Sequence, residues 1–314
     1  MKDVRIVFMG TPDFAVTILK HLVENNYAIV GVITAVDKPA GRGRKLNQSA
    51  VKKYALSQNL PVLQPKNLKN EDFQKELKSL SANLQIVVAF RMLPKVVWNM
   101  PQLGTFNLHA SLLPEYRGAA PIHWAIINGE TKTGVTTFFI DDKIDTGEII
   151  LQEEITISNH ETVGTLHDKL MFLGANLVAK TIDLIKTENI TTIKQPALEE
   201  KLAPKLYPEN CKIDWTASLE TIYNKIRGLN PFPAAWTIIK NNDEEISSKI
   251  YAVKKEKEKH LYDIGQIITN KKEMKVAVQN GFIIIDEIKL SGKKKMDAKS
   301  LLNGFTFSRN SKMM

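Results

Sequence analysis

The apolar residues in the first half of this 314-residue chain follow two patterns, short continuous runs and helical spacing. Residues 4–9 are almost all apolar and end at Gly10, which is typical of a strand buried on both faces. Residues 13–25 instead place apolar side chains three and four positions apart, as on one side of a helix. Because strands alternate with helices in this way, the pattern predicts right-handed βαβ crossovers and a mostly parallel sheet.

Further elements follow from the same two patterns. Strands are predicted at 27–34, 61–63, 84–90, 105–110, 133–140 and 148–157. Helices are predicted at about 49–58, within 70–81, at about 120–128 and at 162–186. In a sheet of this kind the functional loops gather at the carboxyl ends of the strands, so candidate chemistry is sought in the segments that follow strands.

The pattern changes in the last third of the chain. Residues 188–208 are polar and contain three prolines, which indicates a linker. Beyond them, turn signals separate short strands, which favours a small β-barrel. These strands are predicted at 235–240, 248–253, 265–269, 274–279 and 282–290. We therefore expect a first domain over 1–189, a linker over 190–208 and a second domain over 209–314.

Composition narrows the classes of protein that fit. Hydrophobic residues make up 43% of the chain and charged residues 25%, as in an ordinary globular protein. The single cysteine, Cys211, excludes an intramolecular disulfide and a cysteine-cluster zinc site. No apolar run approaches the roughly 18 residues that cross a bilayer, and the first residues lack the pattern of a signal peptide. We therefore expect a cytoplasmic protein with no membrane partner.

The net charge of +9 is concentrated toward the end of the chain. Residues 1–203 hold 23 basic and 21 acidic side chains, whereas residues 204–314 hold 20 basic and 13 acidic ones. Such an excess favours contact with a polyanion such as a nucleic acid, because phosphate neutralisation dominates that binding. A lysine-rich surface that serves solubility alone explains the same excess. The glycine-hinged basic loop 37–45 is likewise either a mobile surface loop or a functional lid or phosphate contact.

Three polar residues are the strongest candidates for chemistry. Asn107 and His109 lie two positions apart on a predicted strand, so their side chains project from the same face. Asp145 follows in the tight turn Asp145-Thr146-Gly147. An amide and an imidazole side by side can both donate hydrogen bonds to one developing oxyanion, and a carboxylate can orient and charge the imidazole. This combination predicts acyl transfer without a nucleophilic side chain.

Other chemistries fit these residues less well. The turn at 10–12 lacks the glycine pattern of a dinucleotide site, and no Walker sequence occurs, which argues against NAD and ATP. Ser111 lacks the elbow motif of a serine hydrolase. The acidic turn 141–147 does not place ligands and a glycine at the spacing of a calcium loop, so we expect no metal.

The chain resembles the methionyl-tRNA formyltransferases over nearly its whole length. The motif Asn-x-His-x-Ser-Leu-Leu-Pro at 107–114, with Asp-Thr-Gly at 145–147, is shared by formyltransferases that use 10-formyltetrahydrofolate. The basic loop, Ile-Asp-Trp at 213–215 and Asn-Pro-Phe-Pro at 230–233 are more specific to the tRNA enzymes. Further matching segments are 8–15, 117–121, 134–136 and 203–205.

The resemblance implies a fold, an activity and partners. The implied fold is a Rossmann-like catalytic domain, with helices on both faces of its sheet, followed by an OB-like barrel that grips tRNA. The implied activity transfers the formyl group of 10-formyltetrahydrofolate to the α-amino group of methionine on initiator methionyl-tRNA, for translation initiation. The implied partners are this tRNA and the folate co-substrate, without a metal. We expect a monomer.

Residue by residue, the resemblance implies that Asn107, His109 and Asp145 are catalytic. The implied folate contacts are Ser111, Leu112, Leu113, Pro114, Phe90, Arg91 and Leu93. The implied contacts with tRNA and its methionine are Phe14, Arg42, Arg44, Lys45 and Lys205. One departure lies in the folate pocket, where this chain has Phe90-Arg91 in place of the tyrosine and glycine that are common in the family.

Two other functions remain open on the residues alone. A formyltransferase for a small amine, such as an amino-sugar nucleotide or glycinamide ribonucleotide, keeps the three polar residues. It needs neither the basic loop nor a basic second domain. A non-catalytic RNA-binding protein could use the barrel alone, but this leaves Asn107, His109 and Asp145 unexplained.

Overall fold

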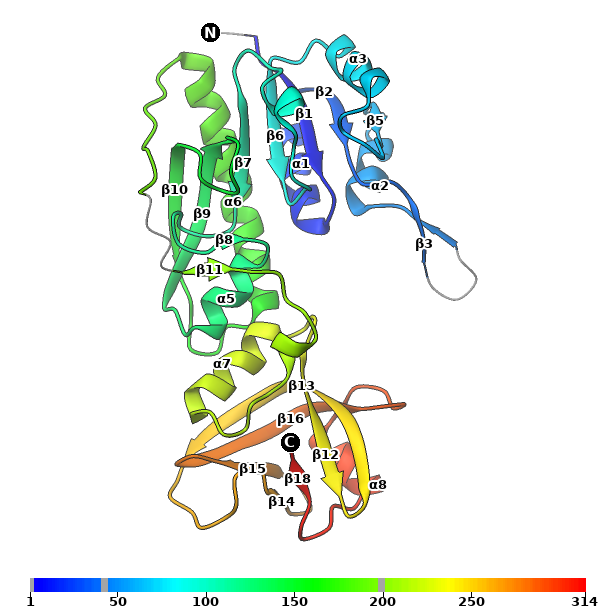
Figure 1. Ribbon diagram of the computed structural model, residues 1–314, viewed down its shortest axis with the longest axis vertical. Helices are drawn as coiled ribbons and strands as arrows, with labels where there is room; N and C mark the ends of the chain where they lie inside the picture. Colours follow the sequence, from blue (N-terminus) through cyan, green and yellow to red (C-terminus); the bar gives the residue numbers. More distant parts are fainter. Residues whose placement is uncertain (1–2, 41–44, 197–200) are drawn as a thin grey trace. The chain divides into compact units, whose positions relative to one another are not determined.

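The computed structural model describes residues 3–40, 45–196 and 201–314 (Figure 1). The chain divides into two compact units. The first comprises residues 1–118, 133–155 and 167–202, and the second comprises residues 119–132, 156–166 and 203–314. The chain therefore passes between the units more than once.

A seven-stranded sheet forms the centre of the first unit, in the order β10-β9-β7-β6-β1-β2-β5. The strands are β1 (Arg5–Gly10), β2 (Ala28–Ile33), β5 (Val62–Leu63), β6 (Leu84–Val88), β7 (Thr105–His109), β9 (Lys132–Phe139) and β10 (Ile149–Thr156). The neighbours from β5 to β7 pair in parallel, whereas β9 runs antiparallel to β7. The predicted mostly parallel sheet is confirmed, with an antiparallel edge that the hydrophobic pattern does not reveal.

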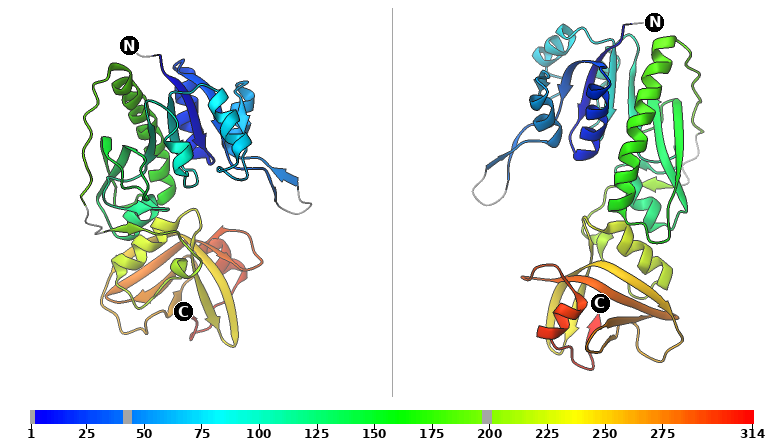
Figure 2. Two further views of the ribbon diagram at one scale, coloured as in Figure 1. Left: turned by 45° about the horizontal axis from the view of Figure 1, so that its top comes forward. Right: turned by 180° about the vertical axis from the view of Figure 1, so that it is seen from behind.

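Helices cover both faces of this sheet. The helices of the first part of the chain are α1 (Asp13–Glu24), α2 (Ala50–Ser57), α3 (Glu71–Ser79), α4 (Lys95–Trp98) and α6 (Val163–Thr187). One core packs Met9 and Val87 of the sheet against Phe73 of α3 and Val97 of α4. On the other face lie α1 and α6, as the right-hand view of Figure 2 shows. The predicted Rossmann-like architecture is therefore confirmed.

Four short strands in the described first part of the chain lie outside this seven-stranded sheet. At the two ends of the basic loop lie β3 (Lys38–Ala40) and β4 (Lys45–Asn47), which pair antiparallel as a hairpin. Two further short strands are β8 (Arg117–Gly118) and β11 (Leu202–Ala203).

Among the residues described, no helix combines the length and the apolar character needed to cross a membrane.

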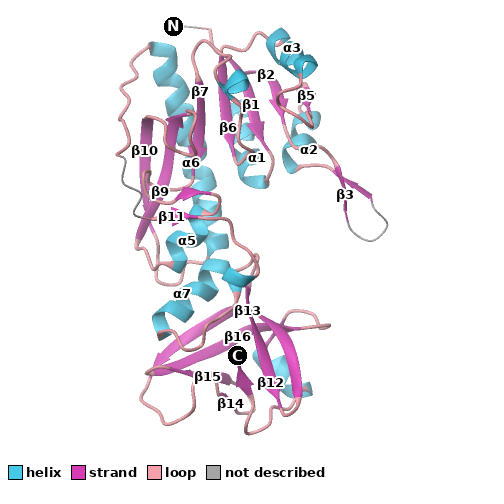
Figure 3. Cartoon of the chain, viewed as in Figure 1, coloured by secondary structure: helices cyan, strands magenta, loops and turns pink. Residues whose placement is uncertain are grey.

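The second unit is built mainly from strands (Figure 3). They are β12 (Ala235–Asn241), β13 (Glu244–Lys257), β14 (Ile267–Thr269), β15 (Met274–Val278), β16 (Gly281–Leu290), β17 (Met296–Asp297) and β18 (Lys312–Met313). The order is β14-β15-β16-β13-β12-β18, and β17 pairs with β16. The N–H of Ile267 donates to the carbonyl of Ser311 at 2.9 Å, which joins the two ends of this order. The predicted OB-like barrel is confirmed.

Helices of the second unit include one that the strand pattern conceals. They are α5 (Pro121–Ile127), α7 (Leu219–Leu229), α8 (Ala298–Gly304) and the 3₁₀ turn Glu209–Cys211. The Ser218 side chain caps α7 by accepting from the N–H of Thr221. Ile222 and Ile226, four positions apart on α7, are buried in the barrel core. The short-strand pattern of this region does not predict α7.

Candidate active site

Strand β7 holds two of the candidate side chains in the interior of the sheet. Asn107 lies between Val87 of β6 and Phe138 of β9, and His109 lies beside Thr136 of β9. Because β7 is paired on both sides, its register cannot shift without breaking both pairings. Positions two apart on a strand share a face, so the structure places the amide and the imidazole as the spacing predicts.

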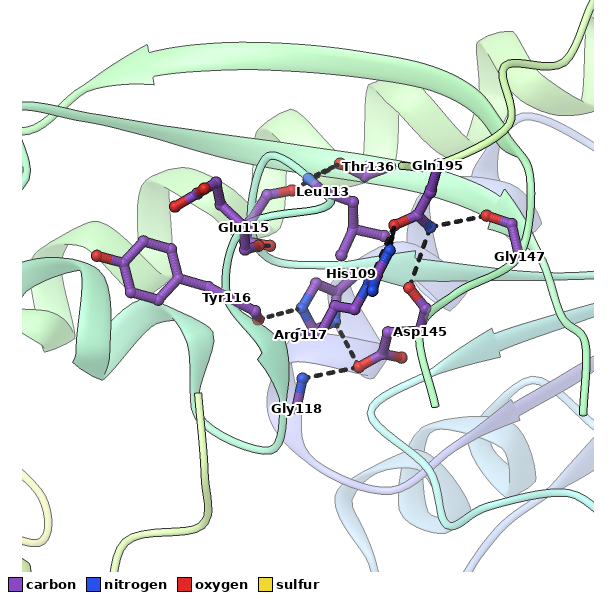
Figure 4. A network of polar contacts seen from close by, with 11 residues as sticks. His109, Leu113, Glu115, Tyr116, Arg117, Gly118, Thr136, Asp145, Gly147 and Gln195 are labelled. Atoms are coloured by element: carbon purple, nitrogen blue, oxygen red, sulfur yellow. Dashed lines mark hydrogen bonds and ion pairs between the residues drawn. The ribbon is translucent and has the colours of Figure 1, made fainter. Parts of the chain in front are cut away.

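The imidazole ring of His109 lies between two oxygen atoms (Figure 4). The ring is buried, and its Nε2 is 2.9 Å from the carbonyl oxygen of Tyr116. A carbonyl oxygen can only accept, so Nε2 carries the hydrogen of this bond. Nδ1 lies 3.8 Å from Oδ2 of Asp145. The structure therefore brings the imidazole and the carboxylate together, with Nδ1 as the nitrogen nearer to Asp145.

The turn that carries Asp145 is held in an unusual conformation. Asp145 has a φ of +55°, in the left-handed region that residues other than glycine rarely adopt. Its Oδ2 accepts a hydrogen bond of 2.9 Å from the N–H of Gly118. Two residues later, a Cβ on Gly147 would lie 1.6 Å from the carbonyl oxygen of Phe139, so only glycine fits there. The turn is thus packed tightly against the end of β9.

Two buried side chains, Gln195 and Arg117, also hold this turn. The sequence pattern does not identify either as a site residue. The Nε2 of Gln195 donates to the carbonyl oxygens of Asp145 and Gly147, at 3.0 and 2.7 Å. Its Oε1 accepts from Nε and Nη2 of Arg117, at 3.1 and 2.7 Å. Gln195 comes from the polar segment expected to be a linker, where a single amide gives no signal of such a role.

Asn107 carries a polar atom without a partner. Its Oδ1 is buried and makes no hydrogen bond within the described part of the protein. Buried polar atoms are nearly always paired in native proteins, and exceptions are frequent at functional sites. The Asn107 residue as a whole is only partly buried. The Asn107 amide is therefore a candidate functional group.

The turn after β7 is fixed by hydrogen bonds to the neighbouring strand. The Ser111 hydroxyl donates to the carbonyl of Glu115 at 2.7 Å. The Thr136 hydroxyl donates to the carbonyl of Ser111 at 2.6 Å and accepts from the N–H of Leu113 at 3.1 Å. Ser111 and Leu113 are buried, whereas Leu112 and Pro114 are partly exposed. Of the four folate contacts predicted here, Leu112 and Pro114 are therefore the ones open to a ligand.

A groove of about 700 Å³ lies beside the segment that follows β6. Residues 66–69 and 91–96 line it, including Arg91 and Leu93 from the predicted folate contacts. Phe90 lies next to it, with its ring 5.6 Å from the guanidinium carbon of Arg91. Arg91 donates to the carbonyls of Pro65 and Lys66. The arginine that departs from the family pattern therefore ties together the two segments that form the groove.

Polar contacts hold the base of the basic loop. The Asp37 carboxylate accepts from Nε2 of Gln64 at 2.8 Å and from Nζ of Lys52 at 2.6 Å. These two bonds hold the pKa of Asp37 below its ordinary value. The loop thus begins at a fixed point, from which the hairpin of β3 and β4 extends.

The residues predicted to contact tRNA and methionine fall in different places. Phe14 is buried in the first unit, where its ring makes an edge contact with His167 at 5.3 Å. Lys205 belongs to the second unit, and its Nζ lies 5.4 Å from the ring centre of Tyr207. Arg42 and Arg44 lie outside the described residues, and only the backbone of Lys45 is described.

Comparison with known proteins identifies the family. Two family models match the chain, "Formyl transferase" over residues 4–182 and "Formyl transferase, C-terminal domain" over residues 205–306. A methionyl-tRNA formyltransferase of Flavobacterium johnsoniae is 62% identical over 314 residues, covering 100% of both chains. The chain belongs to the methionyl-tRNA formyltransferase family. Another member, from Bacteroides thetaiotaomicron, is 52% identical over 318 aligned positions and covers 99% of each chain. The family resemblance drawn from the motifs is confirmed.

Solved structures share the fold at lower identity. The N-formyltransferase from Helicobacter canadensis, solved with folinic acid and dTDP-3-aminofucose, matches with a TM-score of 0.67 and 22% identity, covering 93% of this chain and 100% of that one. HypX from Aquifex aeolicus, solved with tetrahydrofolic acid, matches with a TM-score of 0.65 and 16% identity, covering 96% of this chain and 47% of that one. At these identities the likeness shows the fold alone.

Proposed function

We propose that this chain transfers the formyl group of 10-formyltetrahydrofolate to the α-amino group of methionine on initiator methionyl-tRNA. The observation that carries the proposal is 62% identity, over the whole of both chains, to a methionyl-tRNA formyltransferase. The arrangement of Asn107, His109 and Asp145 supports it, because these groups can stabilise an acyl-transfer intermediate without a covalent step on the protein.

In the proposed reaction the neutral amine of methionine attacks the formyl carbon. The new C–N bond forms as the carbonyl oxygen becomes an oxyanion, and the bond from carbon to N10 of the folate then breaks. The amine loses one proton and N10 gains one. Asp145 takes the amine proton, directly or through a water molecule, as a general base.

Asn107 and His109 stabilise the oxyanion in this proposal. The hydrogen on Nε2 of His109 is already donated to Tyr116, so the donor to the oxyanion is Nδ1 of the imidazolium. Nδ1 lies 3.8 Å from Oδ2 of Asp145, so the proposed oxyanion donor and the proposed base are neighbours. The amide nitrogen of Asn107 supplies a second hydrogen bond to the oxyanion.

The groove beside β6 suits the folate co-substrate. Its volume of about 700 Å³ lies within the roughly 300–1,000 Å³ of ligand pockets in general. Leu93 and Met92 offer apolar surface, while Lys66, Lys69 and Arg91 place positive charge along the wall. A folate combines an aromatic ring system with carboxylates at its far end. The ring system can pack on the apolar surface, and the carboxylates can pair with the positive charges. We assign Phe90, Leu112 and Pro114 to the same ligand.

The tRNA is assigned to positively charged surface in two places. The basic loop with Arg42, Arg44 and Lys45 is proposed to contact the acceptor end, and Phe14 the methionine. Lys205 and the barrel, which contributes most of the excess positive charge, are proposed to bind the tRNA backbone. We further propose that the protein works as a monomer in the cytoplasm, with residues 1–189, 190–208 and 209–314 as catalytic domain, linker and tRNA-binding domain.

The test compares acceptors with 10-formyltetrahydrofolate as the donor. Formyl transfer to charged initiator tRNA should exceed transfer to amino-sugar nucleotides or glycinamide ribonucleotide, and the KM for tRNA should rise steeply with salt because phosphate contacts release counterions. Transfer to a small amine that matches the rate with tRNA, or a KM for tRNA that is flat across the salt series, would contradict the proposal. Binding of tRNA without any release of tetrahydrofolate would indicate an RNA-binding protein instead.

A further inference from the structure

The candidate base and three residues around it form a closed ring of contacts within the first unit (Figure 4). The Asp145 carboxylate accepts from the N–H of Gly118 at 2.9 Å. The preceding residue, Arg117, donates through Nε and Nη2 to Oε1 of Gln195, and Nε2 of Gln195 donates back to the main-chain carbonyl of Asp145. Asp145 is therefore held at both its carboxylate and its backbone by groups that hold each other.

The chemistry of glutamine fits its place in this ring. Gln195 is 8% exposed, and its amide uses both kinds of hydrogen-bonding group. The Nε2 supplies hydrogens to two carbonyls, of Asp145 and Gly147, while Oε1 accepts two hydrogens from Arg117. A glutamate would accept from the arginine but could not donate when ionised, and a methionine of similar length would do neither. Only an amide satisfies both sides at once.

The turn needs such support because its own conformation is unfavourable. A non-glycine residue in the left-handed region costs of the order of 1 kcal/mol and persists only when its surroundings hold it there. Asp145 has this conformation, with a φ of +55°. The two bonds from Gln195 fix the carbonyls on both sides of Thr146. The Gln195 amide therefore holds the backbone that sets the direction of the Asp145 carboxylate.

We infer that Gln195 is a positioning residue for the formyl transfer, which acts by holding Asp145 in the orientation that faces His109. Arg117 orients the Gln195 amide. The inference rests on the proposed role of Asp145 as the base. It predicts an effect on the chemical step and none on the binding of either substrate, since Gln195 is held in contact with the turn and Arg117.

The first experiment replaces the amide in the full-length protein. Gln195→Met and Gln195→Glu should each lower kcat by about 10–100-fold, the cost of a displacement of the order of 1 Å in a catalytic group. The KM values for tRNA and folate should stay within twofold. Thr192→Val is the matched control, because it removes a hydrogen bond to Glu148 from the same segment without touching the turn. Circular dichroism and thermal melting check that each variant is folded.

The second experiment is a double-mutant cycle in single-turnover assays with Asp145→Asn. If Gln195 acts through Asp145, Gln195→Met should cost far less in the Asp145→Asn background than in the parent. Losses that multiply in the double variant, or a Gln195→Met protein with parental kcat, would overturn the inference while leaving the proposed function intact. Full activity of Asp145→Asn alone would instead remove the proposed base, and with it the basis of both proposals.

Discussion

The buried network around Asp145 and the charged surface of the barrel use polar side chains in opposite ways. Around Asp145 in the first unit, Arg117 and Gln195 are buried, and each is bonded to particular atoms: Gln195 to two backbone carbonyls of the turn, and Arg117 to the amide oxygen of Gln195. Charged pairs on the barrel surface stay open to solvent, as in the pair of Lys254 and Asp286, whose side chains are 70% and 37% exposed. A buried network fixes direction because each atom has one place, whereas an exposed pair can exchange its partner for solvent or for another charge.

This difference matches the two tasks that the proposed reaction sets. An oxyanion and a departing proton demand groups placed to a fraction of an ångström. A tRNA backbone presents a repeated charge that many arrangements of lysine can meet, so its binding tolerates exchange. Changes in the buried network should therefore act on kcat and on stability, whereas changes on the barrel surface should act weakly and through tRNA binding.

The largest effect is expected at the imidazole. His109→Ala should lower kcat by roughly 10²–10³, the usual cost of one oxyanion donor. The reason is that Nδ1 is lost while Asp145 keeps its contact with Gly118. Rapid-quench measurement of formyl-methionyl-tRNA gives the rate, with Lys254→Ala as the control on the barrel. Near-parental turnover of the His109 variant would mean that the imidazole takes no part in the reaction. The buried network would then not be the catalytic site, and the comparison with the barrel surface would fail.

A second test inserts one methyl group beneath the Asp145 turn. Gly147→Ala places a Cβ on the carbonyl oxygen of Phe139, so the turn must move. We expect a loss of about 1–3 kcal/mol in the free energy of unfolding of the first unit. The kcat should fall as well, because Asp145 moves with the turn. Gly304→Ala is the control, since a Cβ there meets no atom within 4 Å. A stable and active Gly147 variant would show that the turn is adaptable after all.

A third change tests whether buried polar groups of the barrel serve stability alone. The indole N–H of Trp215 donates to the Thr237 hydroxyl at 2.8 Å in the barrel interior. Thr237→Val leaves this N–H unpaired and should cost about 1–2 kcal/mol of unfolding free energy. Turnover at saturating tRNA should not change. Thr216→Val, at an exposed turn, is the control for loss of a hydroxyl. A fall in kcat would mean that the barrel takes part in the chemistry.

How far the sequence predicts this molecule depends on the range of the interactions involved. Periodicity predicts β7 and the common face of Asn107 and His109, because both are properties of neighbouring residues. The sequence shows Ser218 and the helical spacing of α7, but the short-strand pattern around them dominates the prediction. Gln195 could not be found at all, because its contacts with residues 50 positions away depend on the finished fold.

The smallest effect is expected for the exposed ion pair on the barrel. Lys254 and Asp286 approach to 3.1 Å, yet both side chains remain open to solvent. Their coupling in a double-mutant cycle with alanine should be about 0.2–1 kcal/mol at low ionic strength and smaller still in concentrated salt. Urea unfolding of the four proteins at two salt concentrations measures it. Asp286→Ala should also leave the KM for tRNA unchanged or lower it, since it frees a lysine to meet phosphate. A coupling well above 1 kcal/mol that survives high salt would mean that this exposed pair is held as rigidly as the buried network around Asp145. The contrast between the two regions would then not hold.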